Sequence, residues 1–154
     1  MGWFGKSKVG KALAGAAGAV QKDLTGNKDF LEAACAFAAL MAGAEGGVSP
    51  AEKQMAIQAV SQSPKLGELF DRAEVEACMN KMISRVESAT GRYALEGEMR
   101  DILKQPDGTE MAKYVAFIGY DVMMADGAAG EKEKARFAKG CALLNLDPTE
   151  FYES

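Results

Sequence analysis

Apolar residues recur three and four positions apart along most of the chain, which is the spacing that places side chains on one face of an α-helix. Alternation typical of strands is scarce, and residues that favour helices are abundant. We therefore predict an all-α fold, a compact bundle of about seven to eight helices. The expected helices span residues 7–22, 28–44, 50–62, 72–88, 92–104, 108–125, 131–144 and 148–152.

Several of these helices have clear start signals. Ser49-Pro50-Ala51-Glu52 has the pattern of a capping box with proline at the first helical position. Acidic variants of the same signal begin at Asp71, Asp107 and Asp147. In each of them we expect the aspartate to accept a backbone N–H of the first helical turn.

A short acidic phrase occurs twice, at residues 44–53 and 125–134, which indicates an internal pseudo-repeat. In both copies an acidic residue precedes a glycine, and a Glu-Lys pair follows at the same distance. The predicted helices 28–44 and 108–125 have the longest apolar faces, and each leads into one copy. We therefore expect these two helices at the centre of the bundle, with the two turns facing each other at one end. The faces are Phe30, Ala34, Phe37, Leu40 and Met41, and Tyr114, Phe117, Ile118 and Met124.

The repeated carboxylates have the spacing of half a calcium-binding loop. In both copies the glycine that follows Glu45 or Asp126 is separated by five residues from a second glutamate, as in the second half of an EF-hand. The earlier ligand positions are apolar or glycine, so neither copy is an EF-hand by itself. A site shared between the two turns would bring oxygen ligands together for Ca²⁺ or Mg²⁺. Asp121 and Glu131 are further candidates.

Helix capping is the alternative interpretation of the same carboxylates. Glu52 already belongs to the capping box of Ser49, and Glu45 and Asp126 are also compatible with ordinary helix ends. In the second copy Gly130 stands where Ser49 stands in the first, so capping explains Glu133 less completely. The spacing leaves both interpretations open.

Composition excludes several classes of function. The length of 154 residues suits one domain, and a net charge of −4 argues against nucleic-acid binding. There is no histidine, which removes histidine-based catalysis and most zinc sites, and we find no phosphate loop or nucleophile motif. We therefore expect a protein that is not an enzyme. Cys35, Cys78 and Cys141 are widely spaced, as expected for buried thiols in a reducing cytoplasm.

The first 26 residues differ from the rest, so we divide the chain into a basic, Gly/Ala-rich arm or amphipathic helix (1–26) and a helical domain (27–154). Trp3 and Phe4 are suited to a membrane interface or a partner, with Lys6, Lys8 and Lys11 beside them. The alternatives are a first helix packed on the bundle, or a frayed tail. The chain has no apolar run long enough to span a bilayer and no secretion signal, so we expect a cytoplasmic protein, with peripheral membrane contact through the arm.

The two acidic turns resemble the signature of the TerB-like tellurite-resistance family. The opening Trp3-Phe4-Gly5-Lys6 and the ending Leu146-Asp147-Pro148-Thr149-Glu150-Phe151 are also similar to that family. The resemblance implies an all-helical, non-catalytic module of tellurite resistance and stress or phage defence. It also implies a divalent cation, Ca²⁺ or Mg²⁺, with Glu45, Glu52, Asp126 and Glu133 as its ligands. Glu45 stands where the family usually has Asp.

The partners implied by the resemblance are a TerC-like integral membrane protein and TerD-like proteins. Our leading hypothesis is a module that binds a divalent cation and docks such partners, at the inner membrane surface in one version. The alternative is a structural or assembly protein of a phage, prophage or defence complex that keeps the fold without needing metal. The first predicts stabilisation by calcium, and the second predicts self-association or partner binding that is indifferent to a chelator.

Overall fold

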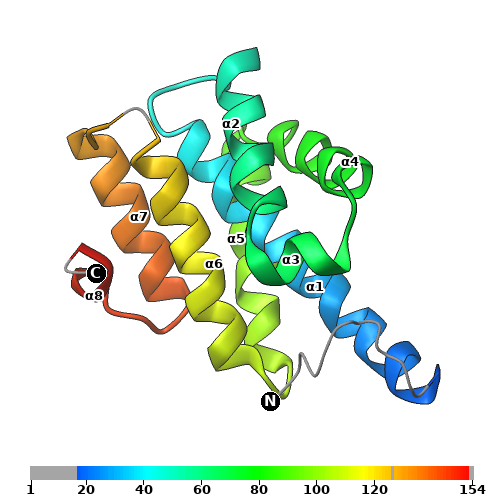
Figure 1. Cartoon of the computed structure of the whole chain (residues 1–154). Coiled ribbons are helices and arrows are strands. Elements are labelled where there is room, and N and C mark those ends of the chain that lie inside the picture. The colour runs from blue at the N-terminus through cyan, green and yellow to red at the C-terminus, as the bar shows by residue number, and fades with distance from the viewer. Residues whose placement is uncertain (1–16, 126, 153–154) are drawn as a thin grey trace.

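The computed structural model describes residues 17–125 and 127–152, with side chains from residue 27 onward, and this part of the chain is all-helical (Figure 1). It confirms the predicted fold class, with eight α-helices and one 3₁₀ helix in the described residues. The elements are α1 (Ala17–Ala42), α2 (Pro50–Ser61), α3 (Pro64–Leu69), α4 (Arg72–Ile83), α5 (Ala89–Asp101), η1 (Ile102–Lys104), α6 (Gly108–Met123), α7 (Glu131–Leu143) and α8 (Thr149–Tyr152).

Helix α1 is the axis of the bundle. Every residue from Ala33 to Ala39 is fully buried, and a helix that is apolar on all sides belongs in the interior. The run is mostly alanine, so neighbouring helices approach closely. Helices α2, α4, α5, α6 and α7 all pack on α1, and its contact with α6 is the most extensive. The two helices expected at the centre of the bundle therefore do pack on each other.

The helices differ from the prediction in three places. The break predicted between residues 22 and 28 does not occur, because α1 is continuous from Ala17 to Ala42 and Gly26 within it costs only about 1 kcal/mol against alanine. Helix α4 ends at Ile83, five residues before its predicted end. The short helix α3 was not predicted, although Pro64 stands at its first position. At six residues it is too short to produce a periodic pattern.

Most of the predicted helix caps are present. Ser49 Oγ accepts the Glu52 N–H at 3.1 Å, and Asp71 Oδ1 accepts the Glu74 N–H at 2.8 Å. Asp147 Oδ1 accepts the Thr149 N–H at 3.0 Å. Asp107 is the exception: its carboxylate makes no capping bond. Its backbone (φ −99°, ψ 26°) is not in the extended conformation that aims an N-cap side chain at the first turn.

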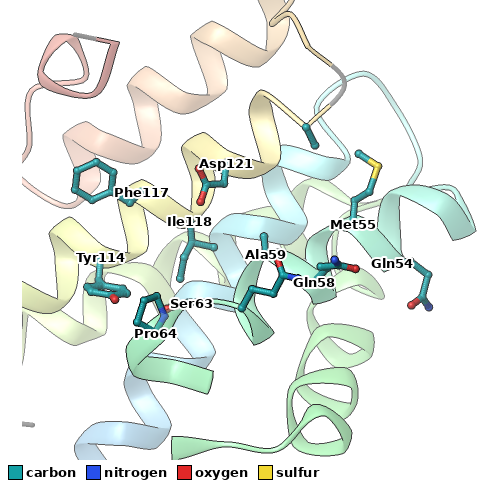
Figure 2. Close-up of a pocket in the computed structure, with 12 residues that line it drawn as sticks. Gln54, Met55, Gln58, Ala59, Ser63, Pro64, Tyr114, Phe117, Ile118 and Asp121 are labelled. Atoms are coloured by element: carbon teal, nitrogen blue, oxygen red, sulfur yellow. The ribbon is translucent and has the colours of Figure 1, made fainter. Parts of the chain in front are cut away.

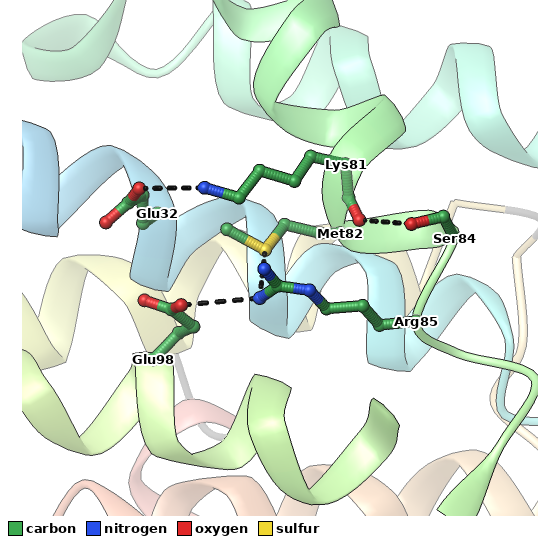
Figure 3. A network of polar contacts seen from close by, with 6 residues as sticks. All are labelled: Glu32, Lys81, Met82, Ser84, Arg85 and Glu98. Atoms are coloured by element: carbon green, nitrogen blue, oxygen red, sulfur yellow. Dashed lines mark hydrogen bonds and ion pairs between the residues drawn. The ribbon is translucent and has the colours of Figure 1, made fainter. Parts of the chain in front are cut away.

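Ion pairs join α1, α4 and α5 on one side of the bundle (Figure 3). Lys81 Nζ lies 3.3 Å from Glu32 Oε2, which links α4 to α1. Arg85 Nη1 lies 3.3 Å from Glu98 Oε2 of α5. All four side chains are partly exposed, so each pair contributes at most about 1 kcal/mol and mainly fixes the orientation of the helices.

Candidate functional site

The two acidic turns are alike at their glycines and at the residue that caps the next helix, which confirms the pseudo-repeat in three dimensions. Gly46 has φ 140° and Gly127 has φ 100°, values that favour glycine because it lacks a Cβ. The Gly46 N–H donates to the Gly43 carbonyl at 3.1 Å, and the Gly127 N–H donates to the Met124 carbonyl at 2.9 Å. Each turn then becomes extended at the residue that caps the next helix.

The turns also lie side by side at one end of the bundle (Figure 1). A Cβ added to Gly130 would lie 2.9 Å from Glu45 Oε2 and 3.8 Å from Glu133 Oε1. The carboxylate of the first turn therefore reaches across to the start of α7, and two of the four predicted ligands converge there. This is the facing arrangement that the repeat predicted.

Both second glutamates cap helices. Glu52 Oε1 accepts the Ser49 N–H at 2.8 Å, and Glu133 Oε1 accepts the Gly130 N–H at 2.7 Å. The interpretation that capping explains Glu133 less completely was wrong for this oxygen, because the bond needs only the backbone N–H of residue 130. In both residues Oε2 does not take part in the cap and remains able to bind a ligand.

The described carboxylates do not by themselves form a complete metal site. Within residues 27–125 and 127–152, no three Asp, Glu or Cys side chains are placed to hold an ion together. Asp126 lies outside the described residues, as do Trp3, Phe4, Lys6, Lys8 and Lys11. Glu131 is exposed at the start of α7, whereas Asp121 lines a groove described below. Glu45 and Glu133 are the two predicted ligands that approach the same point, the backbone of Gly130.

A comparison with known protein families tests the family resemblance that the two acidic turns suggest. The family model described as "Tellurite resistance protein TerB" matches residues 31–153, which include both acidic turns and every helix after α1. The chain belongs to the TerB family. Neither a curated protein nor a solved structure matches it. Among the described helices of this TerB-family chain, none is long and apolar enough to cross a membrane.

The same TerB-family fold has an open groove of about 760 Å³ between α2, α3 and α6 (Figure 2). Met55 and Phe117 line it and are exposed to 38% and 45%. Burial raises the pKa of the Asp121 carboxyl, which lies in the same groove. Phe117 was predicted on a core face, and the groove was not predicted, because α3, which forms part of it, has no periodic pattern in the sequence.

A pair of thiols was also missed by the sequence analysis. Cys35 of α1 and Cys78 of α4 lie 43 positions apart in the sequence, yet their side chains are close enough for each thiol to shift the pKa of the other. This interaction raises the pKa of Cys35 and lowers the pKa of the half-buried Cys78. Burial raises the pKa of Cys141 to about 12. All three thiols are free, and two of them are buried as expected.

Proposed function

We propose that this TerB-family protein is a non-catalytic module that binds a divalent cation between its two acidic turns and docks protein partners. The convergence of Glu45 and Glu133 beside Gly130 carries the proposal. Two carboxylates held this close repel each other, and a hard cation with oxygen ligands would relieve the repulsion. Asp126, which adjoins Gly127 of the second turn, and the remaining oxygen of Glu52 are the further ligands that we assign. Calcium is the favoured ion, because it accepts irregular oxygen geometry better than magnesium.

Calcium should raise the melting temperature of the intact protein, and the rise should depend on the acidic turns. At ten times its dissociation constant a ligand of the folded state adds about 1.4 kcal/mol, which corresponds to roughly 3–6 °C for a protein of this size. We expect this rise with calcium relative to EDTA, a smaller rise with magnesium, and no rise in the double variant Glu45→Gln/Asp126→Asn. Scanning calorimetry measures all of these.

The control is Glu74→Gln, which also removes a glutamate charge but lies in neither acidic turn; Glu74 caps α4, with the Asp71 N–H 2.9 Å from Glu74 Oε1. It should keep the full calcium response. In EDTA the double variant should be at least as stable as the parent, since the repulsion is removed. If no ion shifts the parent, the carboxylates serve as caps and the cation part of the proposal fails.

The groove favours one alternative, an assembly protein that keeps the fold without needing metal. Exposed Phe117 and Met55 support partner docking or self-association at that surface, whether or not an ion is bound. The two functions differ in their response to a chelator. Partner binding or oligomer size that is the same in calcium and in EDTA would favour the assembly role.

The N-terminal segment provides the proposed contact with the membrane or a partner, including TerC-like or TerD-like proteins. If Trp3 and Phe4 insert into an anionic membrane, the variant Trp3→Ala/Phe4→Ala should lose most of its binding to vesicles that contain phosphatidylserine, measured by flotation. The matched control is Tyr93→Ala, which removes an aromatic ring that is 68% exposed on α5 and should leave flotation unchanged. Equal flotation of all three proteins would contradict membrane contact. A change in oligomer size without vesicle binding would indicate assembly through the arm.

A further inference from the structure

Two arginines, Arg92 and Arg136, line the same clefts beside the first acidic turn. Arg92, in the first turn of α5, donates from Nη1 to the Val86 carbonyl at 2.7 Å. Arg136, in the second turn of α7, donates from Nη1 to the Leu40 carbonyl at 3.1 Å, near the end of α1. These bonds fix both side chains on the backbone. Both arginines line a cleft of about 480 Å³ and a second cleft of about 270 Å³.

Neither guanidinium takes part in an ion pair with a described carboxylate; the four described pairs involve other residues. Glu96, which lines the smaller cleft, lies 3.0 Å from Lys139 instead. Glu45 extends toward Gly130, and Glu87 stands exposed at the wall of the larger cleft. Lys132, at the start of α7, adds a third positive charge to that cleft.

Placing the positive charges of Arg92 and Arg136 in the same clefts costs electrostatic free energy. Arg136 is half-buried, and its pKa is lowered by burial and by the positive charge of Arg92, while the negative charge of Glu96 partly opposes this shift. A guanidinium nevertheless stays protonated at neutral pH, so both charges persist. Each guanidinium has five N–H donors and gives one nitrogen to a carbonyl, so further donors remain for a ligand. An anion between the two would be attracted by both charges and would accept bonds from donors that are already in position.

We propose that Arg92, Arg136 and Lys132 form a binding site for a small, doubly charged oxyanion of the phosphate type. The planar fork of each arginine matches two oxygens of such an ion, and the lysine contributes a third point of charge. The clefts are large enough for a small ion. Glu45 and Glu87 at the wall disfavour nucleic acids and other extended polyanions. Tellurite, which the family is named for, is also a small oxyanion and therefore a candidate competitor for this site.

The test is calorimetric titration of the intact, metal-free protein with sodium phosphate at neutral pH, with ionic strength held constant by sodium chloride. We expect saturable binding of one phosphate per chain. Arg92→Gln should weaken it at least tenfold, and Lys132→Gln several-fold. Lys113→Gln is the matched control, because Lys113 is exposed on α6 and lines neither cleft, and it should bind as the parent does.

Arg92 also anchors a backbone carbonyl, so the result does not depend on that variant alone. Lys132 is exposed and its replacement should not impair folding. Heats that do not saturate, or parent-like binding by both Lys132→Gln and a folded Arg92→Gln, would overturn the proposal. Tellurite is then added as a competitor to the phosphate complex. If tellurite displaces phosphate, one site accepts both anions. If the phosphate complex persists, the site is specific for phosphate.

Discussion

Replacing Phe37 with alanine is expected to lower the free energy of unfolding by about 3–5 kcal/mol. Phe37 is fully buried on α1, and its ring is stacked on Phe137 of α7 with centroids 5.8 Å apart. Its opposite edges touch α6 at Gly119 and α7 at Gly140. Removing the ring therefore leaves a cavity among three helices, and close-packed backbones cannot collapse to fill it.

Urea denaturation measures the loss, with Tyr93→Ala as the control for removing an aromatic side chain. Tyr93 is 68% exposed and its ring contacts Arg100, so its loss should cost less than about 1 kcal/mol. A similar cost for both variants would show that Phe37 does not occupy the centre of the core. If the free energy of unfolding falls with urea concentration at the same slope in parent and variant, Phe37→Ala lowers stability without changing the surface exposed on unfolding.

The sequence was sufficient for the all-α class and for most helices, because these follow from local patterns. Helices α2 and α4 begin at capping boxes that can be identified within four residues. The buried run from Ala33 to Ala39 is equally local, and it marks α1 as an interior helix. Errors arose where the local residue types were misleading. Helix α1 continues through Gly26, and Asp107 has the residue type of an N-cap without the backbone conformation.

The candidate site could be predicted only in part. The repeat predicts two similar turns, and their conformation follows from glycines that favour positive φ. The approach of Glu45 to Gly130 depends instead on how α1 and α7 cross, which no local pattern encodes. The same limit applies to the thiols of Cys35 and Cys78 and to the two arginines of the oxyanion site, since residues far apart in the chain meet only after packing.

Adding a methyl group at both Gly119 and Gly140 is expected to lower the free energy of unfolding by about 2–4 kcal/mol. A Cβ at Gly119 would lie 2.6 Å from two atoms of the Phe37 ring, and one at Gly140 would clash with two atoms on the other edge. Each alanine alone should cost less, because the ring can shift toward the remaining glycine. The two methyl groups together block both directions, so the double variant Gly119→Ala/Gly140→Ala should lose more than the sum of the single variants.

The control separates this crowding from the intrinsic preference of helices for alanine. Gly97 lies inside α5, and a Cβ there meets no atom closer than Arg100 Nη2 at 4.0 Å. Gly97→Ala should therefore stabilise the protein by about 0.5–1 kcal/mol, as alanine does in an uncrowded helix. Adding Phe37→Leu to the double variant should recover part of its loss, because the smaller side chain leaves room for both methyl groups. A double variant as stable as the parent would mean that the ring does not lie between the two glycines, and the central role of Phe37 would have to be abandoned with it.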